Sequence, residues 1–590
     1  MNFILQLFQL HFDLEHLSVQ LFESKTLLFF LSSGIIVILF LWVMSLVGNP
    51  YVSFLILLVA TILTGFANQQ KQLYRGEPLY PSDLAMVRNL PFLIDMVNPW
   101  LVFLLIFLVA ISITICIFIY KKTYKKFTMK SLIFRTILFV FTSSILFYTG
   151  QFNQPNNYVR ELFNINAYWT TFSQQLNYEG NGFIPGFLYN LNAPAVDRPA
   201  RYSKEKVEHI VNEYSQKAIE LNKDRVTPLT DVNILFVMNE SFSDPYEIEG
   251  MKISEDPIPN IRKIMKNNLS GKILSQGYGG GTANIEFEAL TGISIEPLAS
   301  NITTPYIQLT SKMSEFPTIV SYLKQHDYTA TAIHPFNTTM YKRNDVYKEI
   351  GFDHFISEST MKNDKILESN RYISDESAYK EILDRMNNTP TMDFIHLVTM
   401  QNHMDYTGKY PDTEFQAVGS SNDEEAINYY QDLQYSDIAL KEFLNDLDSF
   451  EEKTMVVFWG DHLPSFYGKK LYDENGLRTM HETPLIIYTN YNKEEKYINT
   501  ISPIYLLNHV LEKNNAPLTP FQTLLLELES VLPAFEKNIY IENVAEEIKA
   551  SRSDLAASTL KVLNDYDMVL YDLTTGENHA HELGFYEIKD

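Results

Sequence analysis

Three residues able to bind a divalent cation stand directly after apolar runs of strand length. Glu240 follows "NILFVMN", and the adjacent pair Asp461 and His462 follows "TMVVFWG". Carboxylate oxygens and an imidazole nitrogen are the ligands that a hard or borderline divalent ion prefers. Each residue alone has an ordinary explanation, because a carboxylate after a strand often caps the next helix. Together they predict one metal site at the ends of different strands of one sheet.

A threonine able to act as a nucleophile follows a run of glycines. In "GYGGGTANIEFEALTG", residues 277–292, Thr282 comes directly after Gly279–Gly281. Glycines permit unusual backbone angles and close approach of a ligand, and a metal or base lowers the pKa of a hydroxyl. The spacing excludes a nucleotide P-loop, because no G-K-[ST] follows. A simple turn would explain the glycines alone. With the three metal-binding candidates nearby, Thr282 is interpreted as the nucleophile.

A basic residue and two histidines suit a phosphate diester. His334 and Arg343 lie in "HPFNTTMYKRNDVYKEIGF", and His403 lies in "VTMQNHMDY". The guanidinium group of arginine can donate two hydrogen bonds to two phosphate oxygens at once, and histidine can donate or accept a proton. Single histidines in loops are usually plain surface groups, so this prediction depends on the neighbouring metal site. His396, inside an apolar run, is interpreted as structural.

The part of the chain after Asp231 alternates strands with helices. Its apolar strand-length runs are "NILFVMN", "ATAIHPF", "DFIHLVTM", "TMVVFWG" and "PLIIYTN". Continuous apolar strands are buried on both faces, which predicts a mainly parallel sheet sandwiched by helices. Such a sheet places function at the carboxyl ends of its strands, where the candidate residues lie. We expect one extracytoplasmic α/β domain over residues 226–590.

The first 150 residues predict an α-helical membrane domain. Four apolar runs have about the length of a spanning helix: 27–47, 51–66, 101–120 and 132–150. The basic loop "KKTYKKFTMK" after the third run is expected to face the cytoplasm. The fourth span then ends on the outer side of the membrane, so the domain that follows lies outside the cell. Residues 151–225 are expected to form a helical juxtamembrane linker. "NAPAV", residues 192–196, resembles a cleavage site near Ala195, although a turn-forming linker is the simpler interpretation.

Composition excludes several classes of function. The formal net charge of −24 argues against a nucleic acid partner. The single cysteine, Cys116, excludes an intramolecular disulfide and a zinc–thiolate site.

Several motifs together resemble the lipoteichoic acid synthase family, polyglycerolphosphate transferases of the alkaline phosphatase and sulfatase superfamily. They are "RGEPLYPSDL", "MNESFSD", "GGGTANIEFEALTG", "QNHM", "WGDHLP" and "YDLTTGEN", which extend over most of the chain. The threonine motif is the most specific of them. Sulfatases proper carry Cys or Ser in C/S-x-P-x-R, which is absent here. A threonine in its place is typical of a phosphotransferase.

The resemblance implies a role for each candidate residue. Glu240, Thr282, Asp461 and His462 match the family's metal site, usually occupied by manganese, with magnesium or zinc as alternatives. Thr282 would attack phosphatidylglycerol, release diacylglycerol and hold a glycerophosphoryl group. Arg343 and His403 match headgroup-binding positions, with His334 beside them. The family's synthases commonly have an aspartate where Phe336 stands, and five spans rather than four. Both departures indicate a divergent member with a different acceptor.

We therefore expect a multi-pass, metal-dependent glycerophosphotransferase of the cell membrane. Its donor would be phosphatidylglycerol, and its acceptor lipoteichoic acid, a glycolipid or a cell-surface glycan. One alternative is a phosphoethanolamine transferase or phosphodiesterase of the same superfamily. The other is an inactive scaffold for envelope assembly, which would have no need to keep all four residues of the metal site.

Overall fold

The computed structural model divides the chain into two compact units. One contains Met1–Pro194 with Ser300–Thr303, and the other contains Ala195–Ala299 with Thr304–Asp590. The structure describes residues 1–19, 25–75, 78–81, 83, 99–123, 128–154, 156–169, 174–191, 194–225, 229–299, 302–543 and 548–589. Glu77 of the "RGEPLYPSDL" motif and Lys125 and Lys126 of the basic loop lie outside these residues.

The described residues of the first unit form helices joined by turns and loops. Its helices are α1 (Asn2–Gln9), α2 (Leu14–Val19), α3 (Thr26–Val47), α4 (Pro50–Arg75), α6 (Pro99–Thr123), α7 (Met129–Gly150), α8 (Tyr158–Asn164), α9 (Gln174–Asn181) and α10 (Phe183–Tyr189). Helix α3 ends at Gly48, whose left-handed conformation lets its N–H reach the carbonyl of Met44. Asn49 then accepts the backbone N–H groups of Tyr51 and Val52 at the start of α4. Local capping therefore ends α3 and starts α4 within a short turn.

Three described helices are long and apolar enough to cross a membrane: Thr26–Val47, Pro50–Leu73 and Met129–Gly150. They cover the first, second and fourth predicted spans. The predicted span 101–120 lies within α6, which has 25 residues. The number of spans and their orientation stay predictions.

The predicted linker 151–225 is divided between the two units. Helices α8 to α10 belong to the first unit, whereas α11 (Lys204–Asn222) packs on helices of the second. Helix α11 buries Val207, Ile210, Val211, Tyr214 and Ala218, an apolar stripe at helical spacing. Of "NAPAV", Asn192 and Ala193 lie outside the described residues, while Ala195 is buried and Val196 forms a backbone bridge to Leu298.

The second unit is built on one eight-stranded sheet with the order β10-β3-β9-β8-β1-β6-β4-β5. The strands are β1 (Asn233–Asn239), β3 (Leu269–Leu274), β4 (Thr329–His334), β5 (His354–Ser357), β6 (Asp393–Val398), β8 (Thr454–Gly460), β9 (Glu482–Thr489) and β10 (Lys496–Ile501). All neighbouring pairs are parallel except those of β9, which runs antiparallel to β3 and β8. The five predicted strands are β1, β4, β6, β8 and β9, so the predicted fold class is confirmed.

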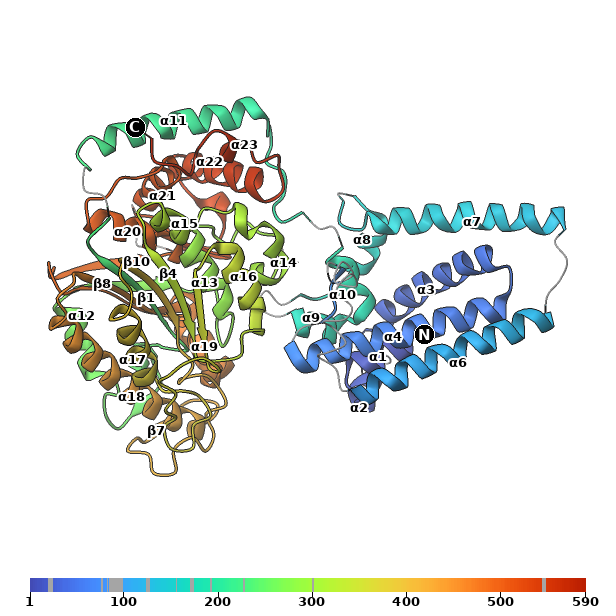
Figure 1. The fold of residues 1–590 in the computed structure, drawn as a ribbon, viewed down its shortest axis with the longest axis horizontal. Helices are drawn as coiled ribbons and strands as arrows, with labels where there is room; N and C mark the ends of the chain where they lie inside the picture. The colour runs from blue at the N-terminus through green and yellow to red at the C-terminus, as the bar shows by residue number, and fades with distance from the viewer. Residues whose placement is uncertain are drawn as a thin grey trace. The chain divides into compact units, whose positions relative to one another are not determined.

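Helices cover both faces of this sheet (Figure 1). One face carries α12 (Pro259–Lys266), α17 (Asp375–Met386) and α18 (Asp423–Asp448); the other carries α13 (Thr282–Thr291), α15 (Ile319–Lys324), α16 (Arg343–Ile350) and α20 (Leu506–Lys513). Every residue of β1 and β8 is buried, as expected of central strands covered on both sides. The hydrophobic core beneath α18 joins Leu235 and Val456 of the sheet to Leu433 and Leu440 of the helix.

The remaining elements surround this core. They are α14 (Pro305–Gln308), α19 (Gly468–His481), α21 (Pro520–Val531), α22 (Ala557–Thr574), α23 (His579–Glu582), and two small sheets made of β2 (Lys252–Ile253) with β7 (Ala417–Val418) and of β11 (Ala534–Glu536), β12 (Ile539–Ile541) and β13 (Ile548–Lys549).

Candidate metal centre and nucleophile

The ends of β1 and β8 bring Glu240, Asp461 and His462 together. The strands are parallel neighbours, with Asn239 opposite Gly460, so the residues that follow them share one edge. The Nε2 atom of His462 lies 3.8 Å from Oε1 of Glu240 and 3.5 Å from Oδ2 of Asp461. All three side chains are buried, and their candidate ligand atoms lie within 4.8 Å of one another. An ion with bonds of roughly 2 Å fits a site of this size.

The hydrogen bonds around these residues leave their ligand atoms directed at one another. Asp461 Oδ1 accepts the backbone N–H groups of Ser241 (2.6 Å) and His462 (2.7 Å), while its buried Oδ2 accepts no hydrogen bond from the part of the chain that the structure describes. His462 Nδ1 lies 3.0 Å from the carbonyl oxygen of Leu463, which holds the ring proton on Nδ1 and leaves Nε2 a lone pair. This set of donors fits a divalent cation.

The raised pKa of Glu240 also indicates a cation site. Burial, together with the negative charge of Asp461, raises the pKa of Glu240 to about 8. Two carboxylates packed without a cation oppose each other's ionisation, and a bound cation removes that conflict.

Thr282 joins this cluster as the first residue of α13. Its hydroxyl donates to Oε2 of Glu240 across 3.4 Å, and its side chain is buried. Unpaired N–H groups and the helix dipole make the start of a helix favourable for an anionic phosphate. The position therefore offers a hydroxyl, a cation site and an anion site within one small volume.

Glycine is required in this run by the backbone angles and, at Gly279, by the close approach of Ser465. Gly279, Gly280 and Gly281 have φ values of 66°, 152° and 103°, which favour glycine. A Cβ at Gly279 would lie 2.6 Å from Cβ of Ser465. The Gly279 N–H donates to the carbonyl of Leu463 across 2.8 Å, so the loop is tied to the segment that carries His462.

Arg343 and His334 lie in a buried network. Arg343 is 1% exposed and directs Nη2 and Nε to Oε2 of Glu286, at 2.7 and 3.2 Å. His334 Nε2 lies 3.2 Å from Nη1 of Arg343, and its Nδ1 lies 3.0 Å from the carbonyl of Val398. Burial, with the charge of Arg343, holds the pKa of His334 well below its ordinary value, so the ring is neutral. The predicted substrate role of both residues stays a prediction.

Sequence reasoning assigned no role to Glu286, although it stands in the threonine motif. Glu286 is completely buried and is contacted by Arg343, by the hydroxyl of Tyr347 and by Nε2 of His396. Burial opposes its ionisation, but Arg343 and His396 outweigh burial and hold the pKa of Glu286 far below its ordinary value. Because α13 carries Glu286 four residues after Thr282, this ion pair anchors the helix of the nucleophile. Two carboxylates, Glu286 and Glu288, in a helix with apolar neighbours were the available signal.

His403 is partly exposed and supported by a tyrosine. Its Nδ1 lies 3.1 Å from the hydroxyl of Tyr372, and burial lowers its pKa. The ring of Phe336 packs edge-on against Tyr372 and against His334, with centroids 5.9 and 6.1 Å apart. The departure from aspartate at Phe336 therefore gives this part of the site an apolar wall.

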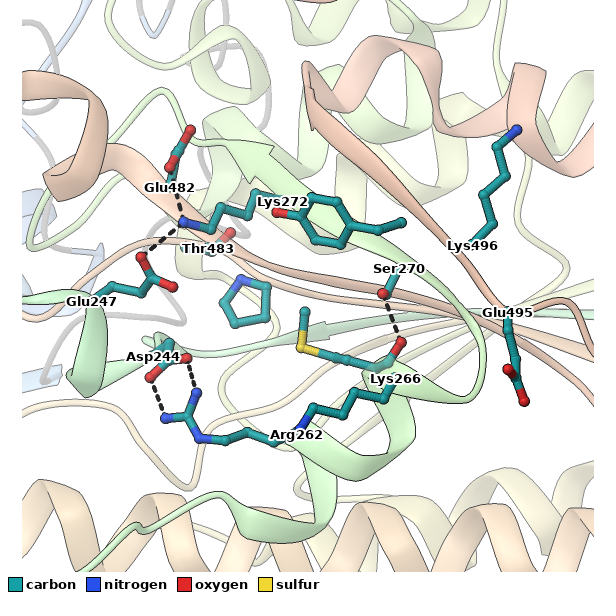
Figure 2. Close-up of a pocket in the computed structure, with 13 residues that line it drawn as sticks. Asp244, Glu247, Arg262, Lys266, Ser270, Lys272, Glu482, Thr483, Glu495 and Lys496 are labelled. Atoms are coloured by element: carbon teal, nitrogen blue, oxygen red, sulfur yellow. Dashed lines mark hydrogen bonds and ion pairs between the residues drawn. The ribbon is translucent and has the colours of Figure 1, made fainter.

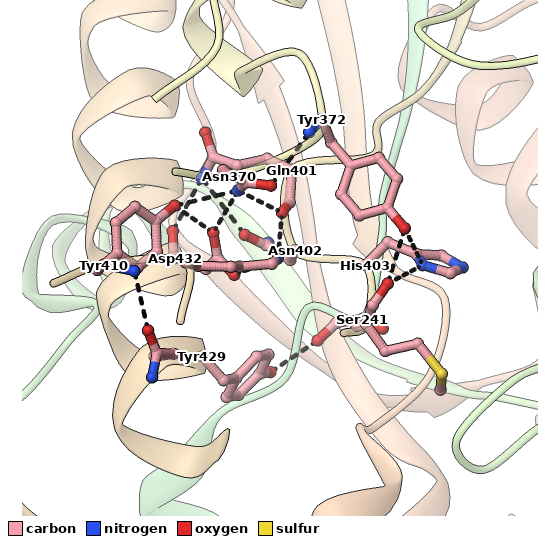
Figure 3. A network of polar contacts seen from close by, with 12 residues as sticks. Ser241, Asn370, Tyr372, Gln401, Asn402, His403, Tyr410, Tyr429 and Asp432 are labelled. Atoms are coloured by element: carbon pink, nitrogen blue, oxygen red, sulfur yellow. Dashed lines mark hydrogen bonds and ion pairs between the residues drawn. The ribbon is translucent and has the colours of Figure 1, made fainter. Parts of the chain in front are cut away.

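Figure 3 shows the polar network behind His403. The Asn402 amide donates to Oδ1 of Asn239 across 2.8 Å, which joins the residue before His403 to the residue before Glu240. Gln401 donates to the backbone carbonyl of Asp432 in α18 across 3.0 Å. Buried networks of this kind fix a single arrangement when every member is satisfied. The network holds His403 and Glu240 in a fixed relationship.

Comparisons with known proteins agree with this fold. Residues 232–513 match the sulfatase family. A putative cyclic beta-1,2-glucan modification protein of Rhizobium meliloti (strain 1021) is 28% identical over 80% of this chain and 74% of its own length. Lipoteichoic acid synthase 2 of Bacillus subtilis (strain 168) is 26% identical over 39% of this chain and 35% of its own length. The structure of Streptococcus pyogenes phosphoglycerol transferase GacH in complex with sn-glycerol-1-phosphate is 26% identical, covers 67% of this chain and 100% of its own, and has a TM-score of 0.60.

The fold and the site define an enzyme of the alkaline phosphatase and sulfatase superfamily. Within it, the chain is similar to the lipoteichoic acid synthases and to the phosphoglycerol transferase GacH.

Proposed function

We propose that the chain is a membrane-anchored, metal-dependent glycerophosphotransferase that uses phosphatidylglycerol as its donor. The observation that carries this proposal is the position of the Thr282 hydroxyl, at a helix N-terminus and 3.4 Å from Glu240 of the metal cluster. The likeness to a phosphoglycerol transferase solved with sn-glycerol-1-phosphate supports the donor headgroup.

Glu240, Asp461 and His462, with Thr282, are the residues that would hold the cation, for which manganese is proposed. A divalent cation there would supply a Lewis acid that lowers the pKa of the threonine hydroxyl and offsets phosphate charge. The rest of the chemistry belongs to the side chains of this chain.

In the first step, Oγ1 of Thr282 attacks the donor phosphorus. A P–O bond forms to Thr282 as the P–O bond to diacylglycerol breaks, and the diacylglycerol oxygen gains a proton in balance with the one that Thr282 loses. His403, whose side chain is partly exposed, is proposed to exchange that proton. The N-terminal N–H groups of α13 stabilise the charge on the phosphoryl oxygens.

In the second step, an acceptor hydroxyl attacks the phosphorus held on Thr282. The P–O bond to Thr282 breaks, and the threonine hydroxyl regains a proton as the acceptor loses one. The acceptor is proposed to be lipoteichoic acid or a cell-surface glycan. The likeness to a putative glucan modification protein over most of the chain favours the glycan.

The membrane topology follows from the same chemistry. We propose a multi-pass membrane unit over residues 1–150, with 226–590 as the extracytoplasmic catalytic domain. A phospholipid donor supplies the reactive phosphodiester without ATP. Protease added to intact cells should cleave an epitope tag at the C-terminus; protection of that tag until the cells are lysed would overturn this orientation.

The reaction is tested by donor turnover of the full chain in vesicles. With labelled phosphatidylglycerol and manganese, the chain should release diacylglycerol. In protein denatured during the reaction, peptide mass spectrometry should find one glycerophosphoryl group on Thr282. Labelling of Thr282 from phosphatidylethanolamine alone would favour the phosphoethanolamine transferase. No turnover of either lipid would favour the inactive scaffold.

A further inference from the structure

A long groove lies beside the catalytic edge of the sheet, on the face that carries α12. It has a volume of about 690 Å³ and is lined by β3, β9 and β10 on one side and by α12 on the other. Ser270 and Lys272 of β3 line it together with Met265 of α12. Figure 2 shows Glu247 and Glu482 at one end of the groove and Glu495 and Lys496 at the other.

The strand register gives the length of the groove. Lys496 pairs with Leu269 at the start of β3, and Glu482 pairs with Leu274 at its end. The two ends are therefore separated by most of β3, roughly 17 Å at about 3.3 Å per residue. This length suits an extended chain of several sugar units.

One end of the groove is lined by residues on segments that adjoin the proposed active site. Thr483, which lines it, donates its hydroxyl to the carbonyl of Gly460 across 2.7 Å, directly before Asp461. Asp244, which also lines it, follows Glu240 by four residues in the sequence. A chain lying in the groove would thus have one end beside the segments that lead to the metal cluster.

The charges along the groove are balanced and largely paired. Its lining contains the basic residues Arg262, Lys266, Lys272 and Lys496 and the acidic residues Asp244, Glu247, Glu482 and Glu495. Lys272 contacts Glu247 at 3.0 Å and Glu482 at 3.2 Å, and Arg262 contacts Asp244. A polyanion would meet as many carboxylates as cations, whereas a neutral polyol can hydrogen-bond to both.

An aromatic ring stands open to the solvent in the same groove. Tyr497 of β10 is 60% exposed. A tyrosine presents a large apolar face and a polar tip, which suits a site that is half apolar and half wet. The C–H face of a pyranose ring packs on such a face while its hydroxyls bond to the charged groups around it.

We propose that this groove binds a neutral glycan and presents its end to the active site. The proposal that a glycan binds here depends only on the residues that line the groove. The proposal that this glycan is the acceptor rests on the proposed function.

Binding is measured without any donor lipid. The full chain in detergent is applied to an array of neutral bacterial oligosaccharides, together with polyglycerol phosphate as an anionic probe. The best neutral oligosaccharide is then titrated against the unaltered chain, Tyr497→Ala and Tyr497→Phe. Loss of one stacking contact of about 1.4 kcal/mol predicts about tenfold weaker binding for Tyr497→Ala. Tyr497→Phe keeps the ring and should bind within about twofold of the parent on the same stacking argument.

Two results would overturn the proposal. One is the absence of binding to every neutral oligosaccharide, and the other is unchanged affinity in Tyr497→Ala. Binding of polyglycerol phosphate alone, weakened by salt and by Lys266→Ala with Lys496→Ala, would assign the groove to an anionic polymer instead. Failure of donor turnover in the parent chain, with glycan binding intact, would refute the proposed function and leave the groove as a glycan site.

Discussion

The hydroxyl of Thr282 lies 3.4 Å from Oε2 of Glu240, although 42 residues separate the two in the chain. Thr282 begins α13, and Glu240 directly follows β1, so a helix start and a strand end meet at one point. This relationship makes a threonine hydroxyl part of a cluster that is otherwise built to hold a cation.

Removing the hydroxyl should stop the reaction at its first step. We expect Thr282→Ala to lose diacylglycerol release by at least about 10³-fold, since the covalent intermediate has no other oxygen at this position. Thr282→Ser keeps the hydroxyl and should retain measurable turnover. Release is followed with labelled phosphatidylglycerol; equal release by the alanine variant and the parent would show that Thr282 is not the nucleophile.

Cation binding should stabilise the protein through Asp461. At a manganese concentration of about 100 times Kd, the chain should gain about 2.7 kcal/mol of stability over the chelated form. In Asp461→Asn this gain should largely disappear, because a carboxylate ligand is lost. Thermal unfolding with and without chelator measures the effect, and Asp412→Asn, an exposed aspartate, is the matched control. An equal manganese effect in Asp461→Asn would argue against this metal site.

The buried ion pair of Arg343 and Glu286 should be structural as well as functional. Arg343→Met leaves the carboxylate of Glu286 buried without its cation, which costs about 3–5 kcal/mol. Adding Glu286→Leu removes that carboxylate and should restore part of the loss. Thermal unfolding of the full chain in detergent measures both. If donor turnover returns together with stability in the double variant, Arg343 has no role at the substrate; continued inactivity supports its predicted contact with phosphate.

Stability should fall as the pH rises because of Glu288. Burial raises the pKa of Glu288 to about 8, and the hydrogen bonds from Ser294 and Ile295 lower it only in part. The folded state therefore keeps this proton through a range in which the unfolded chain, with a pKa of about 4.3, has lost it. The contribution is fully present below about pH 4.3 and is lost as the pH approaches 8.

Glu288→Gln tests this dependence, because the amide imitates the protonated acid. Above pH 8 the variant should be more stable than the parent, and near pH 5 the two should be similar. Unfolding temperatures measured from pH 5 to pH 9 give the comparison. A parent chain that gains stability relative to Glu288→Gln on going to alkaline pH would contradict the assignment.

Local patterns were enough to predict the central strands and the residues at their ends. Runs such as "TMVVFWG" are continuously apolar in their middle, which favours a strand buried on both faces, and the polar residue after such a strand lies at the sheet edge. In the same way, three glycines before Thr282 indicated backbone angles that other residues avoid, and the structure gives all three a positive φ. The edge strands β5 and β10 have mixed polarity and were not predicted.

Tertiary structure decided what the sequence left open. Arg343 and His334 lie nine residues apart and are predicted to bind substrate, and only the fold shows that Glu286 from another helix pairs with Arg343 inside the core. The glycan groove likewise depends on β10 lying beside β3, although more than 200 residues separate them. Sequence determined which residues end each strand, because backbone periodicity is local. Only the folded chain decided which side chains meet, because those contacts depend on pairings between distant segments.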